Sequence, residues 1–442
     1  MTPVALPQAV HLNPWQQWKY FSQPRETADW LHQRLGNLAS LHFSGQSYAL
    51  VTTPEGARQV FAVDPNKYLP FWVDSFAGLH GEGSLWVLHG EQHRRERQIF
   101  IPALHARVVR SQAETIRAIT REHIEKWQTG QTIRVVDTTL RISQDIIMRV
   151  VFGVEDDDLI LAGRKILTEV IKSIHPFIVF FPRLQRSWFP LWKKYTIARA
   201  RFDEWAMQLV MMRRARNDPG EDVLGRLLVA SDQNGNPVSD QHICNELFSI
   251  LAAGHNTTYV GLAWVIYELS RHPVVAAKLR EELESAGVVE NPEVAFTLPY
   301  LSAVCNETLR LHTIVPECAR VPTSPVEIID HTIPAGQALV VSIVGIHHDP
   351  ELYPEPDEFR PERFIERNYS VFEFLPFGGG HRRCLGAVLG EYEIRCAVAE
   401  MVLGWDFEPA RKEREIRHNL AMGPKYGVHL QVKGQRQHEL AR

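Results

Sequence analysis

The sequence predicts a mainly α-helical protein with small β-sheets. Long stretches carry apolar residues at spacings of three and four, and short β-branched runs bounded by Gly or Pro occur near the start and after residue 320. The chain of 442 residues is 45% hydrophobic and has no low-complexity run, as is typical of folded globular proteins. We expect one domain over 1–442, with an α-rich body and a β-rich corner formed by about 40–60 and 320–345.

The individual elements follow from these patterns in chain order. Strands are expected at 47–54, 326–330 and 337–344, and helices at 103–127, 138–151, 197–214, 240–270 and 299–311. The turn Pro334–Gly336 separates the last two strands, and Pro273 ends the longest helix because proline lacks a backbone donor. Turn-rich segments at 217–222 and 231–240 are too short to be interdomain linkers.

Charge and cysteine content exclude several classes of protein. A net charge of −4 gives no support to nucleic-acid binding. The first 21 residues hold no apolar run long enough for a signal core or a transmembrane anchor. Five cysteines without CxxC spacing argue against a disulfide framework and against a zinc site. We therefore expect a soluble, cytoplasmic protein.

One glycine-rich segment, FLPFGGGHRRCLG at Phe374–Gly386, places a cysteine behind three potentially cationic residues. Cys384 could be a small buried hydrophobe, the commonest fate of a lone intracellular cysteine. It could also be a thiolate, because backbone N–H groups in a tight turn and at the start of a helix favour a negative sulfur. Arg382 keeps its charge, so it must face water, a carboxylate or a bound anion.

Within this segment, FGGGHRRCLG resembles the haem-binding loop of the cytochrome P450 family. The matching residues are Phe377, Gly380, Arg382, Cys384 and Gly386. The resemblance implies that Cys384 binds the iron of haem b as a thiolate and favours O–O bond cleavage. It also implies the cytochrome P450 fold, in which the haem lies between a long central helix and the cysteine loop.

A second part of the resemblance concerns a charged pair upstream of the loop. ETLR places Glu307 and Arg310 on one face of a helix, an arrangement that taken alone is usually a solvated surface pair. Followed by FRPERF and the cysteine loop, it is similar to the structural triad of the family. The triad would comprise Glu307, Arg310 and Arg363, with a scaffolding role.

The resemblance also assigns four basic residues to the haem propionates. In GEQHRRER, His93 and Arg97 lie one turn apart on a helix, a spacing that also occurs often by chance. In the order of the family they resemble the propionate-binding helix, and Arg320 in PECARV resembles the propionate-binding arginine of a strand. Arg382 would complete the set, since charged hydrogen bonds hold carboxylates well.

The helix expected at 240–270 carries LAAGHNTT near its middle, where Gly254 and two threonines have poor helix propensity. This can be a tolerated weak spot, or a local distortion in which Thr257 bonds toward the carbonyl of Ala253. The segment resembles the oxygen-activation motif of the family, but Asn256 replaces the usual acid. An amide orients water and cannot deliver a proton.

Aromatic residues gather at 174–192, between the early helices and the long one. They can form ordinary core, although the prolines and basic residues among them are more typical of a lid over a lipophilic ligand. The resemblance implies a substrate pocket lined by Phe71, Trp72, Phe76, Phe180, Ala253, Val315 and Met422. Glu317 either pairs with an arginine or fixes a polar group of the substrate.

Taken together, the resemblance implies a haem-thiolate monooxygenase that inserts one atom of O2 into a lipophilic substrate such as a fatty acid or terpenoid. Electrons would come from a separate ferredoxin or flavodoxin, which would dock on Arg94, Arg95, His381 and Arg383. We expect a monomer. Two alternatives remain: a peroxide-driven hydroxylase or lipid isomerase on the same scaffold, and a non-enzymatic haem sensor.

Overall fold

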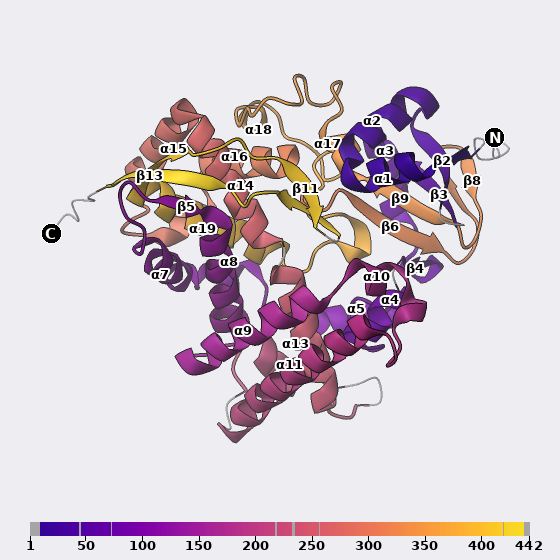
Figure 1. Cartoon of the computed structure of the whole chain (residues 1–442), viewed down its shortest axis with the longest axis horizontal. Coiled ribbons are helices and arrows are strands. Elements are labelled where there is room, and N and C mark those ends of the chain that lie inside the picture. The colour runs from indigo at the N-terminus through magenta and orange to yellow at the C-terminus, as the bar shows by residue number, and fades with distance from the viewer. Residues whose placement is uncertain are drawn as a thin grey trace.

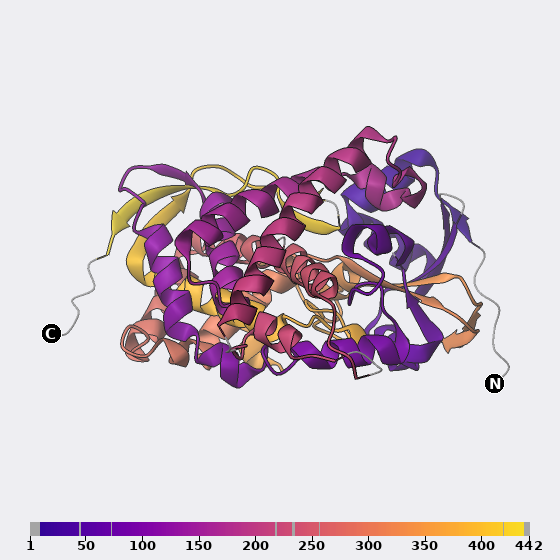
Figure 2. The ribbon, with the colours of Figure 1, turned by 90° about the horizontal axis from the view of Figure 1, so that it is seen from below.

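The computed structural model describes residues 9–436 except 44–45, 72, 217–218, 232–234, 256 and 419. The chain is mainly helical with small sheets, as the sequence predicts (Figure 1). The β-rich corner and the sheet that contains β13 lie at opposite ends of the long axis, which Figures 1 and 2 both show. No helix in the described ranges is long and apolar enough to cross a membrane.

The β-rich corner is one sheet that joins early strands to strands after residue 316. Its order is β1 (Val10–His11), β2 (Leu38–Phe43), β3 (Gln46–Val51), β9 (Ala338–Ser342), β6 (Glu317–Pro322) and β4 (Tyr68–Pro70). β3 and β9 are parallel, with Tyr48 opposite Ala338, and β6 runs antiparallel to β9. Every residue of β9 is buried, as expected for a central strand covered on both faces. This pairing fixes the position of Arg320 on β6.

The helical body is centred on α14 (Thr258–Arg271), which is buried from Val260 to Ser270. A helix that is apolar on all sides must be covered all round. Accordingly α14 packs against α8 (Val135–Ile146), α16 (Pro299–Leu311) and α19 (Ala387–Gly404). Because α19 follows the cysteine loop directly, this packing sets where the loop stands relative to α14.

Other helices cover this centre and the sheet. They are α1 (Pro14–Ser22), α2 (Pro24–Leu35), α3 (Pro54–Ala62), α4 (Val73–His80), α5 (Gly90–Phe100), α6 (Ala106–Arg110), α7 (Ala113–Ile124), α9 (Asp157–Ser173), α10 (Pro176–Phe180), α11 (Pro190–Ala215), α12 (Val223–Leu228), α13 (Asp240–His255), α15 (Pro273–Ser285), α17 (Ile343–His347) and α18 (Arg363–Glu366). Short 3₁₀ or π segments are η1 (Pro65–Lys67), η2 (Ile147–Val151), η3 (Pro182–Leu184), η4 (Pro292–Phe296) and η5 (Gly380–Arg382).

The remaining strands form three small sheets. These are β10 (Trp405–Pro409), β13 (His429–Gln435) and β5 (Thr132–Arg134); β11 (Glu415–His418) and β12 (Ala421–Pro424); and β7 (Val326–Ile328) and β8 (His331–Ile333).

Several predicted elements differ from the structure at identifiable breaks. The helix expected at 299–311 is α16, with the same bounds. The one expected at 103–127 is divided into α6 and α7, and the one at 138–151 ends in the π-helical η2. The single helix expected at 240–270 is also wrong, since α13 ends at His255 and α14 begins at Thr258. β8 also stands between the two last predicted strands, forming a hairpin with β7.

Candidate functional site

The loop before α19 is wrapped tightly around Phe61 of α3. Gly380 has a φ of 66°, and a Cβ there would lie 3.0 Å from the carbonyl oxygen of Phe61, so a side chain would be both strained and crowded. The backbone N–H of Cys384 donates to the carbonyl oxygen of Phe377 at 2.9 Å and closes the turn. Cys384 therefore stands at the end of the loop, just before α19.

The surroundings of the Cys384 side chain are those of a hollow inside the protein. Cys384 is accessible, whereas Cys244, Cys305 and Cys396 are buried. Yet burial raises the pKa of the Cys384 thiol, against the opposing effects of the Gly386 backbone N–H and the charge of Arg383. Accessibility and desolvation occur together when a side chain faces a space that protein encloses. The loop therefore presents its sulfur to an internal space.

Basic side chains from three elements converge beside this loop. They are His93 and Arg97 of α5, Arg320 of β6, and His381 and Arg382 of η5. Burial, and then the charges of Arg382 and its basic neighbours, lower the pKa of His93 to about 3. Burial followed by the charges of Arg320 and Arg97 lowers the pKa of Arg382 to about 9. Such mutual repulsion shows that these cations are close together and poorly hydrated.

The three arginines of this cluster have no carboxylate partner among the described residues, although the charge of Asp64 acts on His381. No carboxylate of the described residues forms an ion pair with Arg97, Arg320 or Arg382, and the guanidinium of Arg382 donates to the carbonyl oxygens of Leu85 and Leu88. Partly buried cations need a counterion. Haem fits this arrangement, because it brings two carboxylates for the cations and an iron that accepts a thiolate.

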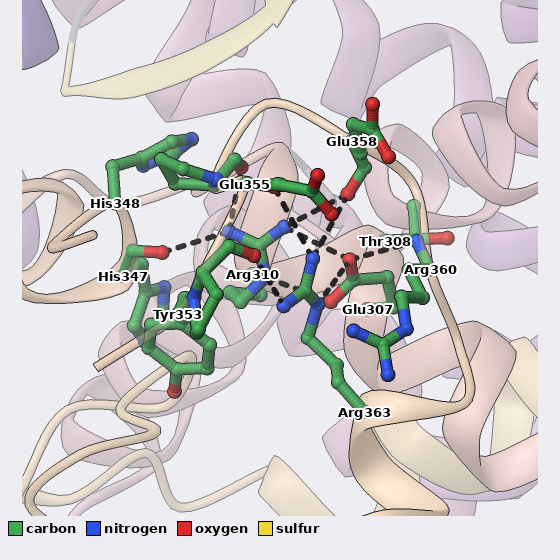
Figure 3. Close-up of polar contacts among 12 residues, drawn as sticks. Glu307, Thr308, Arg310, His347, His348, Tyr353, Glu355, Glu358, Arg360 and Arg363 are labelled. Carbon is green, nitrogen blue, oxygen red and sulfur yellow. Dashed lines mark hydrogen bonds and ion pairs between the residues drawn. The ribbon is translucent and has the colours of Figure 1, made fainter. Parts of the chain in front are cut away.

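Glu307, Arg310 and Arg363 form a fully connected buried network (Figure 3). Glu307 Oε2 accepts from Arg310 Nε at 2.7 Å, and Oε1 accepts from Arg363 Nε at 2.9 Å. The remaining guanidinium N–H groups donate to the carbonyl oxygens of the 354–358 segment and of His347. The structure thus brings the three predicted residues together, and they tie α16 to the chain that leads to the cysteine loop.

His347 is a positioning residue that sequence reasoning missed. It is fully buried, and burial lowers its pKa to about 3, so the ring is neutral. Its Nε2 accepts from the backbone N–H of Leu375 at 2.8 Å, and its Nδ1 lies 3.0 Å from Thr313 Oγ1. One ring therefore links the start of the cysteine loop to the end of α16. No spacing rule could find it, since its partners are distant in sequence.

Thr257 makes the side-chain bond that the distortion hypothesis requires. Its Oγ1 donates to the carbonyl oxygen of Ala253 at 3.0 Å, exactly one turn earlier, where α13 ends. The backbone at Gly254 packs closely against η2. A Cβ on Gly254 would lie 2.6 Å from Ile147 Cδ1. Asn256 lies outside the described residues, so its predicted place at the break has no structural account.

The two predicted walls of the substrate pocket are joined by polar contacts. Ser75 of α4 donates to the carbonyl oxygen of Val179 in α10 at 2.5 Å, and Gln185 donates to the carbonyl oxygens of Ser75 and Ile178. Phe76, on the same helix as Ser75, is buried against Trp86. The 174–192 lid is thus bonded to α4, while Phe177, Phe181 and Trp188 remain exposed.

The other predicted pocket residues come from four different segments of the chain. Ala253 and Val315 are partly buried, Met422 is buried with its N–H bonded to the carbonyl oxygen of Ile314, and Phe71 packs beside Tyr48. Trp72 lies outside the described residues, as does the Phe180 side chain.

Glu317 forms an ion pair with an arginine, Arg417, which is the first of the two roles that the sequence suggests for it. Its carboxylate lies 4.0 Å from Arg417 and bonds to the Tyr20 hydroxyl. Burial raises the pKa of Glu317, and the charge of Arg417 opposes that shift. Since both partners come from outside the predicted pocket, the structure explains Glu317 without a substrate.

Comparisons with known proteins agree with this geometry. The family model named Cytochrome P450 matches residues 6–430. A protein of Mycobacterium tuberculosis named "Putative cytochrome P450 135A1" is 32% identical over 417 residues, covering 92% of this chain and 90% of the relative. Another, named "Putative cytochrome P450 138", is 30% identical and covers 86% and 84%. The solved structure of a retinoic acid-bound cyanobacterial CYP120A1 has a TM-score of 0.86 at 22% identity, covering 98% of this chain and all of that one.

Proposed function

This chain belongs to the cytochrome P450 family and is a haem-dependent monooxygenase, and we propose that Cys384 is the thiolate ligand of a haem b that it binds in a single domain. The observation that carries the assignment is the accessible sulfur of Cys384 beside a group of basic residues, of which Arg97, Arg320 and Arg382 form no ion pair with a described carboxylate. Bound haem supplies the site where O2 is activated and transferred.

The haem propionates would be held by His93, Arg97, Arg320 and Arg382. His93, which burial keeps neutral, would donate one ring N–H, and the three guanidiniums would supply charge-assisted hydrogen bonds. Carboxylates placed among these residues would raise the lowered pKa values of His93, Arg97 and Arg382 and offset the repulsion between the cations. Glu307, Arg310, Arg363 and His347 would position the segment that leads to the loop, because their hydrogen bonds are made within the protein.

On the oxygen side, Thr257 holds its hydroxyl at the break between α13 and α14. Because the Thr257 hydroxyl donates a hydrogen bond to Ala253, its oxygen can still accept a hydrogen bond from a donor such as water. Gly254 allows the break to pack against Ile147. With Asn256 in place of the usual acid, protons reach the site through Thr257 and water.

That asparagine also favours a second candidate, a peroxide-driven hydroxylase or an isomerase of oxygenated lipids, which needs fewer delivered protons. Turnover with hydrogen peroxide, but none with NADPH, a ferredoxin and its reductase, would select this candidate.

The substrate is a lipophilic molecule of the fatty-acid or terpenoid class. The proposed pocket is bounded by Phe71, Phe76, Val315 and Met422, and Glu317 is already paired with Arg417. An apolar pocket with few fixed polar groups selects ligands by their apolar area. A screen of fatty acids, terpenoids and steroids by haem spin-state shift tests this, and a response confined to small polar amines or sugars contradicts it.

Electrons arrive from a separate acidic carrier, a ferredoxin or flavodoxin, at a basic surface near the cysteine loop. Arg94 and Arg95 are exposed on α5, Arg383 is exposed beside Cys384, and the His93 and His381 rings lie 6.0 Å apart, so the two elements adjoin. We place the enzyme in the cytoplasm as a monomer.

The ligand assignment is tested by Cys384→Ser. The purified parent, reduced under carbon monoxide, should show the red-shifted Soret band of thiolate ligation, and the variant should lose that band. Cys318→Ser is the matched control, because Cys318 is a partly buried cysteine on β6 that should leave the band unchanged. A band that survives Cys384→Ser would overturn the assignment.

A further inference from the structure

Glu96, His242 and Glu246 bring three possible metal ligands together away from the haem cysteine. One ligand atom from each side chain lies within 4.8 Å of the others. Glu96 belongs to α5, while His242 and Glu246 lie one turn apart on the same face of α13. His242 Nε2 donates to Glu96 Oε1 at 2.7 Å. The cluster therefore bridges two helices that are distant in sequence.

Glu246 is the feature that an ordinary ion pair does not explain. Its side chain is fully buried, and Oε1 accepts from the backbone N–H of Leu85 at 2.7 Å. Its Oε2 is also buried but has no hydrogen-bond partner among the described residues. A buried oxygen without a partner costs about 1–3 kcal/mol, or more if it is charged. Beside it stands a second carboxylate, Glu96, in place of a cation.

The cluster places two carboxylates beside one imidazole, and that imidazole, His242, is bonded to Glu96. The ring balances one negative charge only when it is protonated, and Glu246 Oε2 then still lacks a partner among the described residues. A divalent cation would neutralise both carboxylates, satisfy Oε2 and leave the imidazole neutral.

We propose that Glu96, His242 and Glu246 bind one divalent transition-metal ion of the zinc class, which fastens α5 to α13. Zinc accepts imidazole nitrogen and carboxylate oxygen at about 2.0–2.2 Å, so ligand atoms on one ion stand about 3–4 Å apart. The ligand atoms lie within 4.8 Å of one another and would move closer together to reach that spacing. The ion replaces the proton that His242 shares with Glu96, and water completes the coordination.

An ion can reach this position from solvent. The His242 and Glu96 side chains are 21% and 12% exposed, so two ligands stand at the surface while Glu246 forms the floor of the site. The site also lies close to the basic residues proposed to bind the haem propionates. The backbone N–H of Leu85 donates to Glu246, and the carbonyl oxygen of Leu85 accepts from Arg382. A bound ion would therefore stiffen the segment on which Arg382 rests.

The test uses the haem-loaded full-length protein, stripped with a chelator and titrated with zinc chloride by calorimetry. The parent should bind one zinc ion per chain, confirmed by metal analysis after gel filtration, and zinc should raise its melting temperature. Glu246→Gln keeps the acceptor for Leu85 and removes the charge, so the variant should fold, retain haem and bind zinc at least tenfold more weakly. His242→Ala should do the same.

Matched controls are Glu91→Gln and His89→Ala, which change exposed residues at the start of the same α5 helix. Both should bind zinc as the parent does. The proposal is overturned if the parent binds no zinc above the level of the Glu246→Gln variant, because the cluster would then be an ion pair beside a protonated carboxyl. Equal loss in the control variants would also overturn it, since the bound zinc would lie elsewhere.

Discussion

Arg310 and Arg320 are both buried, but only Arg310 has a carboxylate partner among the described residues. Glu307 serves Arg310 and Arg363 together, and backbone carbonyls take up the remaining N–H groups. That network is complete without a ligand, which is what a scaffold requires. Arg320 instead donates to the carbonyl oxygen of its neighbour Ala319, and its charge repels that of Arg382. Two neighbouring cations without a carboxylate partner are what a binding site for an anionic cofactor needs.

His312 offers a residue-scale test of stability that does not involve the haem ligand. It stacks on Trp264 and bonds to Glu268 at 2.9 Å, with Glu415 nearby. Burial lowers its pKa, but the bonds to Glu268 and Glu415 outweigh burial and raise the pKa to about 9. Because the folded-state pKa lies above the unfolded value near 6.5, the charged ring adds stability on the order of 3 kcal/mol.

This contribution should be fully present below about pH 6.5 and disappear as the pH rises through about 9. His312→Gln should therefore lower the free energy of unfolding most at pH 6, and the difference from the parent should shrink by pH 9.5. Denaturant titrations of the haem-loaded proteins at several pH values measure this. A difference that stays constant with pH would mean that His312 contributes packing only.

At the scale of elements, the end of α13 and the π-helical η2 depend on each other. Ile147 occupies the space where a Cβ on Gly254 would stand, at 2.6 Å, and Ile147 is itself buried. Gly254→Ala should therefore destabilise the protein by about 1 kcal/mol, because overpacking outweighs the gain in helix propensity. Ile147→Val removes the clashing Cδ1, so in that background Gly254→Ala should cost nothing or stabilise.

A double-mutant cycle from denaturant unfolding measures this coupling. Gly261→Ala is a suitable comparison, because a Cβ there meets its nearest side chains at 3.1 Å or more and not Ile147. If Gly254→Ala costs the same with isoleucine and with valine at position 147, the two elements are not coupled through this contact.

The same elements show what the sequence could predict. Local patterns were sufficient to predict both ends of α16, because Pro299 begins the helix and its apolar period continues without interruption. The break between α13 and α14 was harder, since the apolar period continues through it; the weak helix formers Gly254, Thr257 and Thr258 allowed either a continuous helix or the distortion that the Thr257 bond now marks. Within the loop, the resemblance to the family singled out Cys384 and Arg382, and their roles stay predictions.

Apart from the Glu307–Arg363 contact, which the resemblance to the family implied, the contacts between distant segments could not be predicted from the sequence. His347 reaches Thr313 and Leu375 across gaps of 34 and 28 residues. Glu96 and His242 are 146 residues apart. No motif or period links such pairs, because their proximity arises only when α5 packs near α13 and when the chain after β9 turns back toward α16. Predicting these sites required the fold first.

For the whole molecule, docking of a charged electron carrier depends more on where the charged residues lie than on the net charge of −4. The proposed docking surface, Arg94, Arg95, His381 and Arg383, is local, and the Arg94 side chain is 69% exposed. Exposed charges steer an oppositely charged partner into contact and are screened beyond about 10 Å at 0.1 M salt. An acidic electron carrier should therefore associate with this face faster at low salt.

Arg94→Glu combined with Arg95→Glu should slow reduction by an acidic ferredoxin by roughly tenfold at low salt, while substrate-induced spin shifts stay unchanged. The difference should narrow as salt is raised, because the lost attraction is long-range. Lys412→Glu with Lys433→Glu makes the same change in net charge; Lys433 lies on β13, far from α5 in both Figures 1 and 2. If stopped-flow reduction slows equally in both double variants, net charge and not this surface governs docking, and the carrier binds elsewhere.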